Sequence, residues 1–280
     1  MWTIFVPLLC LFLCLSFGSS RTFESTKVFI AIISRPAGHK MREGIRRTWM
    51  KNCVGNVNCK FVIGADKKNK ELSKEIEEKA DILFLDSHVD VYRNLSLKTL
   101  KTFDLAIQSF EFEVFVKCDD DVFLQVDLLS LSYLSSCPPD GSRCWYGFMM
   151  KDINVVKDHR HKNYESLFEG EVYPEFSAGF CYMIDRVLVE DIVELWKGDG
   201  MVVYSNEDVT TSMAIHKIRK EKPVTIFDSR KLFYNGHATL DNVCTESMAK
   251  HLAIHRIYYD LIDQLNRCVG IWRKLSTKNN

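Results

Sequence analysis

A short apolar run that leads into three consecutive carboxylates constrains the fold of this chain most. Residues Glu113–Val116 are few, β-branched and aromatic, which favours a strand over a helix of that length. Asp119, Asp120 and Asp121 follow after two more residues. Three adjacent charges at the end of a buried strand are costly unless a cation compensates them. We therefore expect the acids at the carboxyl end of a strand, where open α/β sheets bind ligands.

The spacing of the acids indicates what they bind. Asp119 and Asp121 form an Asp-x-Asp pair, and hard oxygen ligands of this kind suit Mn²⁺ or Mg²⁺, especially when phosphates complete the coordination shell. The pattern predicts a site for a metal ion and a diphosphate. A solvated acidic turn is the alternative that the tripeptide leaves open, since charge runs usually face water.

Strand-like and helix-like segments alternate along the first half of the chain. Apolar runs predict strands at 28–33, 60–64, 81–85 and 113–116, and the segments between them predict helices at 41–50, 70–79 and 96–110. This alternation is typical of a parallel sheet with crossover helices. We predict an α/β fold with a mostly parallel central sheet flanked by helices, in a single domain. The segment 151–171 is polar and aperiodic and predicts a surface loop.

The composition excludes some functions. The chain has 280 residues, of which 46% are hydrophobic, so it can bury a sizeable core. Lys and Arg together number 37, and so do Asp and Glu. Because the charges balance, no general basic field is available to hold nucleic acid. The partner must be recognised at a local site.

The first twenty residues read as a leader. Residues Trp2–Phe17 are almost wholly apolar and would span about 24 Å as a helix, against a hydrocarbon core of roughly 30 Å. They form either a short membrane anchor or the apolar region of a signal peptide, with Gly18-Ser19-Ser20 as small residues for cleavage. Either function sends the rest of the chain into the secretory lumen. We expect a leader at 1–20, a short stem at 21–27, a lumenal domain at 28–270 and a tail at 271–280.

Two other features fit an oxidising lumen. Asn94-Leu95-Ser96 is an acceptor sequence for N-glycosylation at Asn94. Eight cysteines lie beyond the leader, namely Cys53, Cys59, Cys118, Cys137, Cys144, Cys181, Cys244 and Cys268. Cys53 with Cys59 and Cys137 with Cys144 are close enough to close small loops, but spacing alone does not decide connectivity. No Cys-x-x-Cys pair appears, which argues against a thiolate zinc site.

Seven blocks, in this order, carry a resemblance to a known family: Arg42–Trp49, Val62–Gly64, Tyr92–Thr99, Lys117–Phe123, Tyr173–Gly179, Glu207–Val209 and Ile254–Arg256. Together they resemble the β1,3-galactosyltransferases and their β1,3-N-acetylglucosaminyltransferase relatives, which are single-pass Golgi enzymes with a GT-A fold. The chain departs from the family pattern at Asn163, where Lys-Trp-Tyr is common, and at Ser212, where glycine is common. We expect these departures to affect acceptor preference more than fold.

The resemblance implies an inverting transferase. A hydroxyl of a glycoprotein, glycolipid or proteoglycan acceptor would displace UDP from UDP-galactose and form a β1,3 bond. Asp121 would be a direct metal ligand and His255 the second protein ligand, with Mn²⁺ preferred and Mg²⁺ able to satisfy the same oxygens. Asp119 would reach the metal through water or hold the ribose, and Asp120 would bind sugar hydroxyls. The expected location is the Golgi membrane, as a single-pass type II protein with a lumenal catalytic domain, or outside the cell if the leader is cleaved.

One carboxylate must accept the proton of the acceptor hydroxyl. Asp208 is the candidate base and Glu207 its helper, although two acids at the start of a helix are also favoured by the helix dipole alone. Arg42 and Arg46 lie four residues apart on one predicted helix face, which suits phosphate contact, while a solvated basic face is the alternative. Ser34, at the end of the first strand, is expected to border the uridine.

Several residues resemble those of other classes of enzyme. His251 and His255 have the spacing of a helical zinc pair, but Leu252 follows His251 where a zinc hydrolase needs Glu. The acidic run also resembles that of aspartyl phosphatases, except that Phe123 stands where they have Thr or Val. Two alternatives remain open. The donor is UDP-N-acetylglucosamine or UDP-N-acetylgalactosamine, or the protein is a catalytically silent relative that binds carbohydrate.

Overall fold

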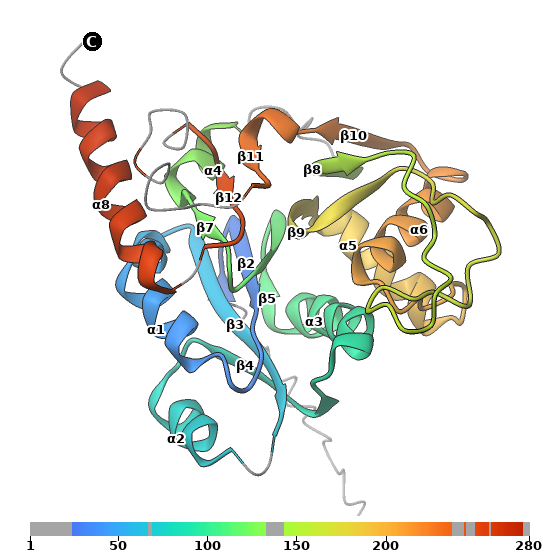
Figure 1. Cartoon of the computed structure of the whole chain (residues 1–280), viewed down its shortest axis with the longest axis horizontal. Helices are drawn as coiled ribbons and strands as arrows, with labels where there is room; N and C mark the ends of the chain where they lie inside the picture. Colours follow the sequence, from blue (N-terminus) through green and yellow to red (C-terminus); the bar gives the residue numbers. More distant parts are fainter. Residues whose placement is uncertain are drawn as a thin grey trace, which may run out of the picture.

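A seven-stranded sheet forms the centre of the molecule, a computed structural model that describes residues 24–66, 69–132, 143–236, 244, 250–257 and 259–276 (Figure 1). The strand order is β10-β8-β9-β6-β2-β3-β4. These strands are β2 (Val28–Ile33), β3 (Val57–Ala65), β4 (Ile82–Val89), β6 (Val114–Asp119), β8 (Arg143–Met150), β9 (Phe176–Asp185) and β10 (Val224–Asp228). Only β9 runs against its neighbours β8 and β6, and the other pairings in this sheet are parallel. The predicted α/β class and mostly parallel sheet are confirmed.

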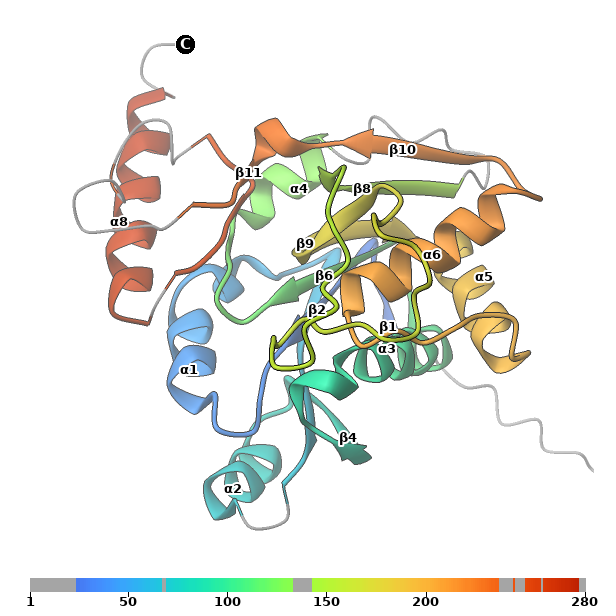
Figure 2. The same cartoon turned by 45° about the vertical axis from the view of Figure 1, so that its right-hand side comes forward.

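Helices cover both faces of the sheet (Figure 2). They are α1 (His39–Arg47), α2 (Lys70–Glu78), α3 (Leu95–Ser109), α4 (Val126–Ser132), α5 (Arg186–Lys197), α6 (Glu207–Arg219) and α8 (Tyr259–Ser276). Every side chain of the central strand β2 is buried. Val28, Ile30 and Ile32 pack with α1, α2, α4 and α8, whereas Phe29, Ala31 and Ile33 pack with α3, α5 and α6. This alternation follows from the two-residue period of a strand, so one strand contributes to two hydrophobic cores.

Short elements complete the edge of the sheet where the acids lie. Strands β11 (Phe233–Tyr234), β12 (Ala253–Ile254) and β7 (Phe123–Leu124) form a second sheet, and single 3₁₀ turns occur at η1 (Trp49–Asn52), η2 (Tyr92–Asn94) and η3 (Arg230–Leu232). Ile254 pairs with Phe123 in the antiparallel β12–β7 ladder. The backbone N–H of Ile257 also donates to the carbonyl of Asp121 at 2.9 Å. Residues far apart in the sequence are therefore held together at the end of β6.

The boundaries at both ends differ from the predicted organisation. β1 (Glu24–Ser25), which lies in the segment expected to be a stem, pairs in parallel with β5 (Phe110–Glu111). α8 continues to Ser276, past the expected start of the tail at 271, and its residues Leu261, Ile262, Leu265 and Val269 pack with residues of α1 and of the sheet. The predicted leader at 1–20 lies outside the described residues. Within the described part of the chain, no helix is long and apolar enough to cross a membrane.

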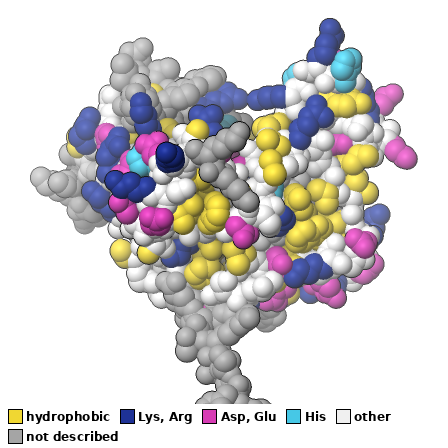
Figure 3. Space-filling model, turned by 90° about the horizontal axis from the view of Figure 1, so that it is seen from below, with side chains coloured by type: hydrophobic (Ala, Val, Ile, Leu, Met, Phe, Trp, Pro, Cys, Tyr) yellow, Lys and Arg dark blue, Asp and Glu magenta, His cyan; other side chains and the backbone are white. Residues whose placement is uncertain are grey.

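Disulfides join Cys53 to Cys59 and Cys244 to Cys268, and Cys144 is also disulfide-bonded. Cys137, the other cysteine expected near Cys144, lies outside the described residues. On the face that Figure 3 shows, acidic and basic side chains are mixed with separate apolar patches, and no single broad basic field appears among the described residues there.

Candidate active site

A cavity of about 420 Å³ opens between the carboxyl end of β6 and the first turn of α6. Residues from β6, β8, β9 and α6 line it, together with the loop 151–175 and the segment after β12. The lining residues that carry polar side chains are Tyr92, Lys117, Asp119, Asn154, Asn163, Tyr173, Ser205, Asn206, Glu207, Asp208, Asn235, His255 and Arg256. The predicted base and two of the predicted metal-site residues thus share one cavity.

Asp119, Asp121 and His255 form a cluster that can hold a cation. One ligand atom from each lies within 4.8 Å of the others, and Nε2 of His255 is 3.6 Å from Oδ1 of Asp121. Oδ1 of Asp121 is buried, and no residue that the structure describes donates a hydrogen bond to it. Buried carboxylate oxygens are rarely left without a partner. Two carboxylates and an imidazole fit a divalent ion such as Mn²⁺ or Mg²⁺, which would supply the missing partner.

Two neighbours fix the ring of His255. Nδ1 lies 2.9 Å from Oδ1 of Asn235, an oxygen to which it can donate a hydrogen bond, and Nε2 faces Asp121. The ring of Phe180 stacks on the imidazole at 4.5 Å between centroids. A partner on the second ring nitrogen is the usual arrangement of a metal-binding histidine. Sequence reasoning missed Asn235, because twenty residues separate it from His255.

Lys117 connects the two acidic groups of the cavity. Its buried ammonium donates to Oδ1 of Asp119 at 2.5 Å, to the carbonyl of Gly179, and to Oε2 of Glu207 at 3.3 Å. Burial alone would lower the pKa of Lys117, but the two carboxylates outweigh it and raise that pKa, so the side chain stays charged. Burial raises the pKa of Asp119 to about 7, with Lys117 opposing the rise. A lysine inside an apolar strand, two residues before an acid, was the signal that could have identified this contact.

Asp120 faces the end of β2. Oγ of Ser34 donates to Oδ2 of Asp120 at 2.7 Å, and the guanidinium of Arg42 donates to Oγ of Ser34 at 2.9 Å. Burial raises the pKa of Asp120. Ser34, which was expected to border the uridine, thus lies next to Asp120, and this chain of hydrogen bonds orients the Asp120 carboxylate.

The arrangement of Arg42 and Arg46 corrects their predicted role. Both were expected to contact phosphate, but Arg42 is fully buried and forms a two-pronged pair with Glu75 at 2.9 and 2.5 Å. Arg46 donates to both oxygens of Asp81 at 2.8 Å and to Glu75 at 2.6 Å. Burial opposes ionisation of Glu75, but the two guanidinium groups lower its pKa to about 2. The guanidinium groups of both arginines are thus bound to carboxylates of the protein and are not available to contact a diphosphate.

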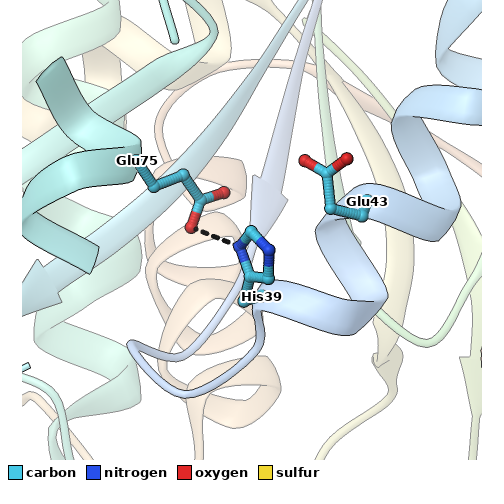
Figure 4. Close-up of side chains that lie close together, drawn as sticks. All are labelled: His39, Glu43 and Glu75. Carbon is cyan, nitrogen blue, oxygen red and sulfur yellow. Dashed lines mark hydrogen bonds and ion pairs between the residues drawn. The ribbon is translucent and has the colours of Figure 1, made fainter. Parts of the chain in front are cut away.

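A second group of possible metal ligands belongs to this ion-pair network. Figure 4 shows His39 and Glu43 on α1 and Glu75 on α2, with Nδ1 of His39 3.2 Å from Oε2 of Glu75. Because Glu75 is already paired with two guanidinium groups, a cation would have to displace an arginine to bind here. The cluster therefore serves the packing of α1 on α2.

Glu207 and Asp208 begin α6 and differ in their surroundings. Glu207 is buried and accepts hydrogen bonds from the hydroxyl groups of Tyr182 at 2.6 Å and Thr211 at 3.3 Å, in addition to its contact with Lys117. Asp208 accepts from the backbone N–H of Val209 at 2.9 Å. Burial, with the charge of Glu207, raises the pKa of Asp208 to about 6. A carboxylate with this pKa can take a proton near neutral pH.

Gly179 lets the strand β9 approach this pair. A Cβ atom at this position would lie 3.0 Å from Oε2 of Glu207 and 3.3 Å from Cβ of Asp208. The block Tyr173–Gly179 therefore places the backbone of β9 close to the two acids. Asn94, the predicted glycosylation site, is the last residue of η2. Its side chain is partly exposed and donates to the carbonyl of Val89 at 3.0 Å.

Comparison with known proteins gives a consistent result. A family model described as galactosyltransferase matches residues 40–222, more than half of the chain. The chain is 30% identical over 203 residues to the β-1,3-galactosyltransferase GALT1 of Arabidopsis thaliana, which covers 68% of this chain and 30% of that protein. It is 27% identical over 211 residues to the lactosylceramide 1,3-N-acetyl-β-D-glucosaminyltransferase of Homo sapiens, which covers 70% of this chain and 55% of that protein. The matches thus span less than two thirds of either relative.

Among solved structures, the bifunctional glycosyltransferase WbbM matches with a TM-score of 0.47 and 13% identity, over 90% of this chain and 51% of that one.

Proposed function

Because this chain belongs to the galactosyltransferase family, we propose that it transfers galactose from UDP-galactose to a sugar hydroxyl of a glycoprotein, glycolipid or proteoglycan. The proposed product carries a β1,3 linkage, formed with inversion at the donor carbon. The observation that carries the proposal is that the candidate metal cluster of Asp119, Asp121 and His255 reaches, through Asp119 and His255, the same cavity that Asp208 lines. The first suits a metal-bound diphosphate and the second suits a nucleophilic hydroxyl.

The residues of the chain divide the chemistry between them. Asp121, Asp119 and His255 would hold the divalent ion, which supplies charge stabilisation for the departing diphosphate. Asp208 accepts the proton as the acceptor hydroxyl attacks, and the N–H of Val209 holds its carboxylate in place. Glu207 keeps Lys117 and Tyr182 at the back of the site and adds negative charge that makes Asp208 more basic. Asp120, oriented by Ser34, is available for hydroxyl groups of the donor.

A donor with an N-acetyl group is the second candidate. The relatives include both galactosyl and N-acetylglucosaminyl transferases, so membership of the family leaves the sugar open. A catalytically silent relative is disfavoured by the raised pKa of Asp208 and by the unpaired oxygen of Asp121 within the described residues, since neither benefits a fold without a ligand.

We also propose that the chain works in the lumen of the Golgi, anchored by its N-terminal segment or released from it. The two disulfides between described cysteines support an oxidising compartment. Immunofluorescence of the full-length chain against a Golgi marker, with protease protection of the C-terminus, tests this location. A cytosolic C-terminus would contradict it.

A donor panel tests the function. The protein is incubated with UDP-galactose, UDP-N-acetylglucosamine or UDP-N-acetylgalactosamine and mixed acceptors, with Mn²⁺, with Mg²⁺ or with chelator, and released UDP is measured. We expect UDP-galactose to be consumed fastest, only with metal present. Preferential use of an acetylated donor would select the second candidate, and no release from any donor would refute a transferase.

A further inference from the structure

The N-cap residue of helix α6 makes no capping hydrogen bond with its side chain. Asn206 occupies the N-cap position, where asparagine is among the most favourable residues, yet its side chain makes no hydrogen bond to the first turn. The N–H of Val209, which an N-cap side chain would normally satisfy, is bonded by Asp208 instead. By contrast, the N-cap Asn69 of α2 accepts from the N–H of Leu72 at 3.0 Å. The side-chain amide of Asn206 is therefore available for contacts outside its own helix.

That amide points across the cavity toward the loop 151–175. Nδ2 of Asn206 lies 3.3 Å from the hydroxyl of Tyr173 and 3.4 Å from the backbone carbonyl of Asn163, both long for hydrogen bonds. The hydroxyl of Tyr92, on η2, donates to Oδ1 of Asn163 at 2.8 Å and so holds the side-chain amide of Asn163 in place. Figure 2 shows the loop passing in front of α6 near the start of α3. The four side chains lie on the lining of the same cavity as Asp208.

The cluster keeps unused hydrogen-bonding groups. Among the described residues, none donates to Oδ1 of Asn206, and none accepts from Nδ2 of Asn163. Both side chains are partly exposed, so these groups face the solvent of the cavity. Asn206 directly precedes Glu207 and Asp208, and all three residues line the same cavity. A molecule that places one hydroxyl against Asp208 would therefore place its other polar groups near the amides of Asn206 and Asn163.

We propose that Asn206, Asn163 and Tyr173 form the acceptor-sugar subsite and that it selects a neutral pyranose. The inference rests on the proposed transferase function and specifies its acceptor class. Amides and a phenol both donate and accept, as sugar hydroxyls do, and Phe176 adds an apolar wall for the face of a ring. A uronic acid would bring a third carboxylate close to Asp208 and Glu207, and like charges in close proximity repel.

Direct binding tests the subsite without relying on turnover. Saturation-transfer NMR measures binding of p-nitrophenyl β-galactoside, β-glucoside, β-xyloside and β-N-acetylglucosaminide, with p-nitrophenyl β-glucuronide as the charged probe, in the presence of UDP and Mn²⁺. At least one neutral glycoside is expected to bind, and the glucuronide is expected to bind at least tenfold more weakly. The variants Asn206→Ala and Asn163→Ala are each expected to weaken the neutral glycoside about 3- to 10-fold, the effect of one or two neutral hydrogen bonds. UDP affinity, measured by calorimetry, should not change.

Asn69→Ala is the matched control, because it removes a genuine cap of the same residue type far from the cavity. It should lower the melting temperature without weakening the glycoside, whereas Asn206→Ala should weaken the glycoside and lower the melting temperature less than the control does. Where transfer is measurable, the acceptor KM should rise in Asn206→Ala while the donor KM stays constant.

The outcomes separate the two proposals. Glycoside binding that depends on Asn206 and Asn163, in a protein that consumes no UDP-sugar, would keep the subsite and reject the transferase. Unchanged glycoside affinity in both variants would overturn the subsite, and so would equal binding of the glucuronide or binding of none of the probes. A loss of UDP affinity in parallel with glycoside affinity would also overturn it, since that pattern indicates a general disturbance of the cavity.

Discussion

Replacing Asp208 by asparagine separates catalysis from stability at this site. The change keeps the size of the side chain and an oxygen that can accept from the N–H of Val209, but it removes the group that takes the proton. A general base usually contributes about 10² to 10⁴ in rate, so we expect kcat to fall by that factor. The corresponding loss of transition-state stabilisation is about 3 to 5 kcal/mol. Metal-dependent binding of UDP should persist, because the predicted metal ligands are unchanged.

The same substitution should make the protein more stable above pH 6. Burial raises the pKa of Asp208 from 3.8 to about 6, which means that its ionised form is disfavoured in the folded state. That rise corresponds to roughly 2 to 3 kcal/mol after allowance for the partial exposure of the group. The destabilisation by the charge is fully present above the folded-state pKa and disappears below the unfolded-state pKa. The asparagine variant should therefore gain stability at pH 7.5 and gain none at pH 3.5.

The assay compares single-turnover rates, UDP affinity and urea unfolding of the wild type and the variant between pH 3.5 and 7.5. Asp86→Asn serves as the control, because Asp86 is exposed on β4 and distant from the cavity. The wild-type kcat/KM should rise with pH through about 6, as Asp208 loses its proton. If Asp208→Asn retains more than a tenth of wild-type turnover, or if its stability relative to wild type is independent of pH, the assignment of Asp208 as base is refuted.

Three further predictions follow from named contacts. Arg42→Lys should lower the free energy of unfolding by about 3 kcal/mol, because it breaks a buried two-pronged ion pair with Glu75. The UDP affinity of the folded protein should not change. Weaker UDP binding at constant stability would restore the predicted contact of Arg42 with phosphate. Asn235→Ala should weaken Mn²⁺ binding, measured by electron paramagnetic resonance, about 10- to 100-fold through loss of the partner of His255, and an unchanged Mn²⁺ affinity would count against His255 as ligand. Replacing Cys53 and Cys59 by serine should cost about 2 kcal/mol in urea unfolding, the value for so short a closed loop, and a cost near zero would contradict a stabilising role.

Much of the framework could be read from local patterns. The apolar runs at 28–33 and 113–116 predicted β2 and β6, because a strand buried on both faces needs continuous apolar residues. The three acids fall at the carboxyl end of β6 because the strand's ladder ends at Asp119. Helix α6 begins with Glu207 and Asp208, a position where the helix dipole favours two acids.

The partners of the charged groups could not be read in this way. Arg42 and Arg46 have the spacing of a phosphate fork, but α2 folds against α1 and brings Glu75 between them. Spacing reveals that two side chains share a helix face and says nothing of what lies opposite. The capping amide of Asn206 likewise turned away from its helix toward Asn163 and Tyr173, which only the loop 151–175 places within reach.

The sequence by itself determined most strands and helices of the first half of the chain and the position of the acidic run at a sheet edge, because these depend on residues close together along the chain. The tertiary structure alone decided which cation neutralises which carboxylate and which amide faces the cavity. Lys117 pairs with Glu207 across ninety residues, and His255 reaches Asp121 through the β12–β7 ladder. Electrostatic and hydrogen-bonding partners depend on distance in space, and in this fold only the packing of the sheets and helices sets that distance.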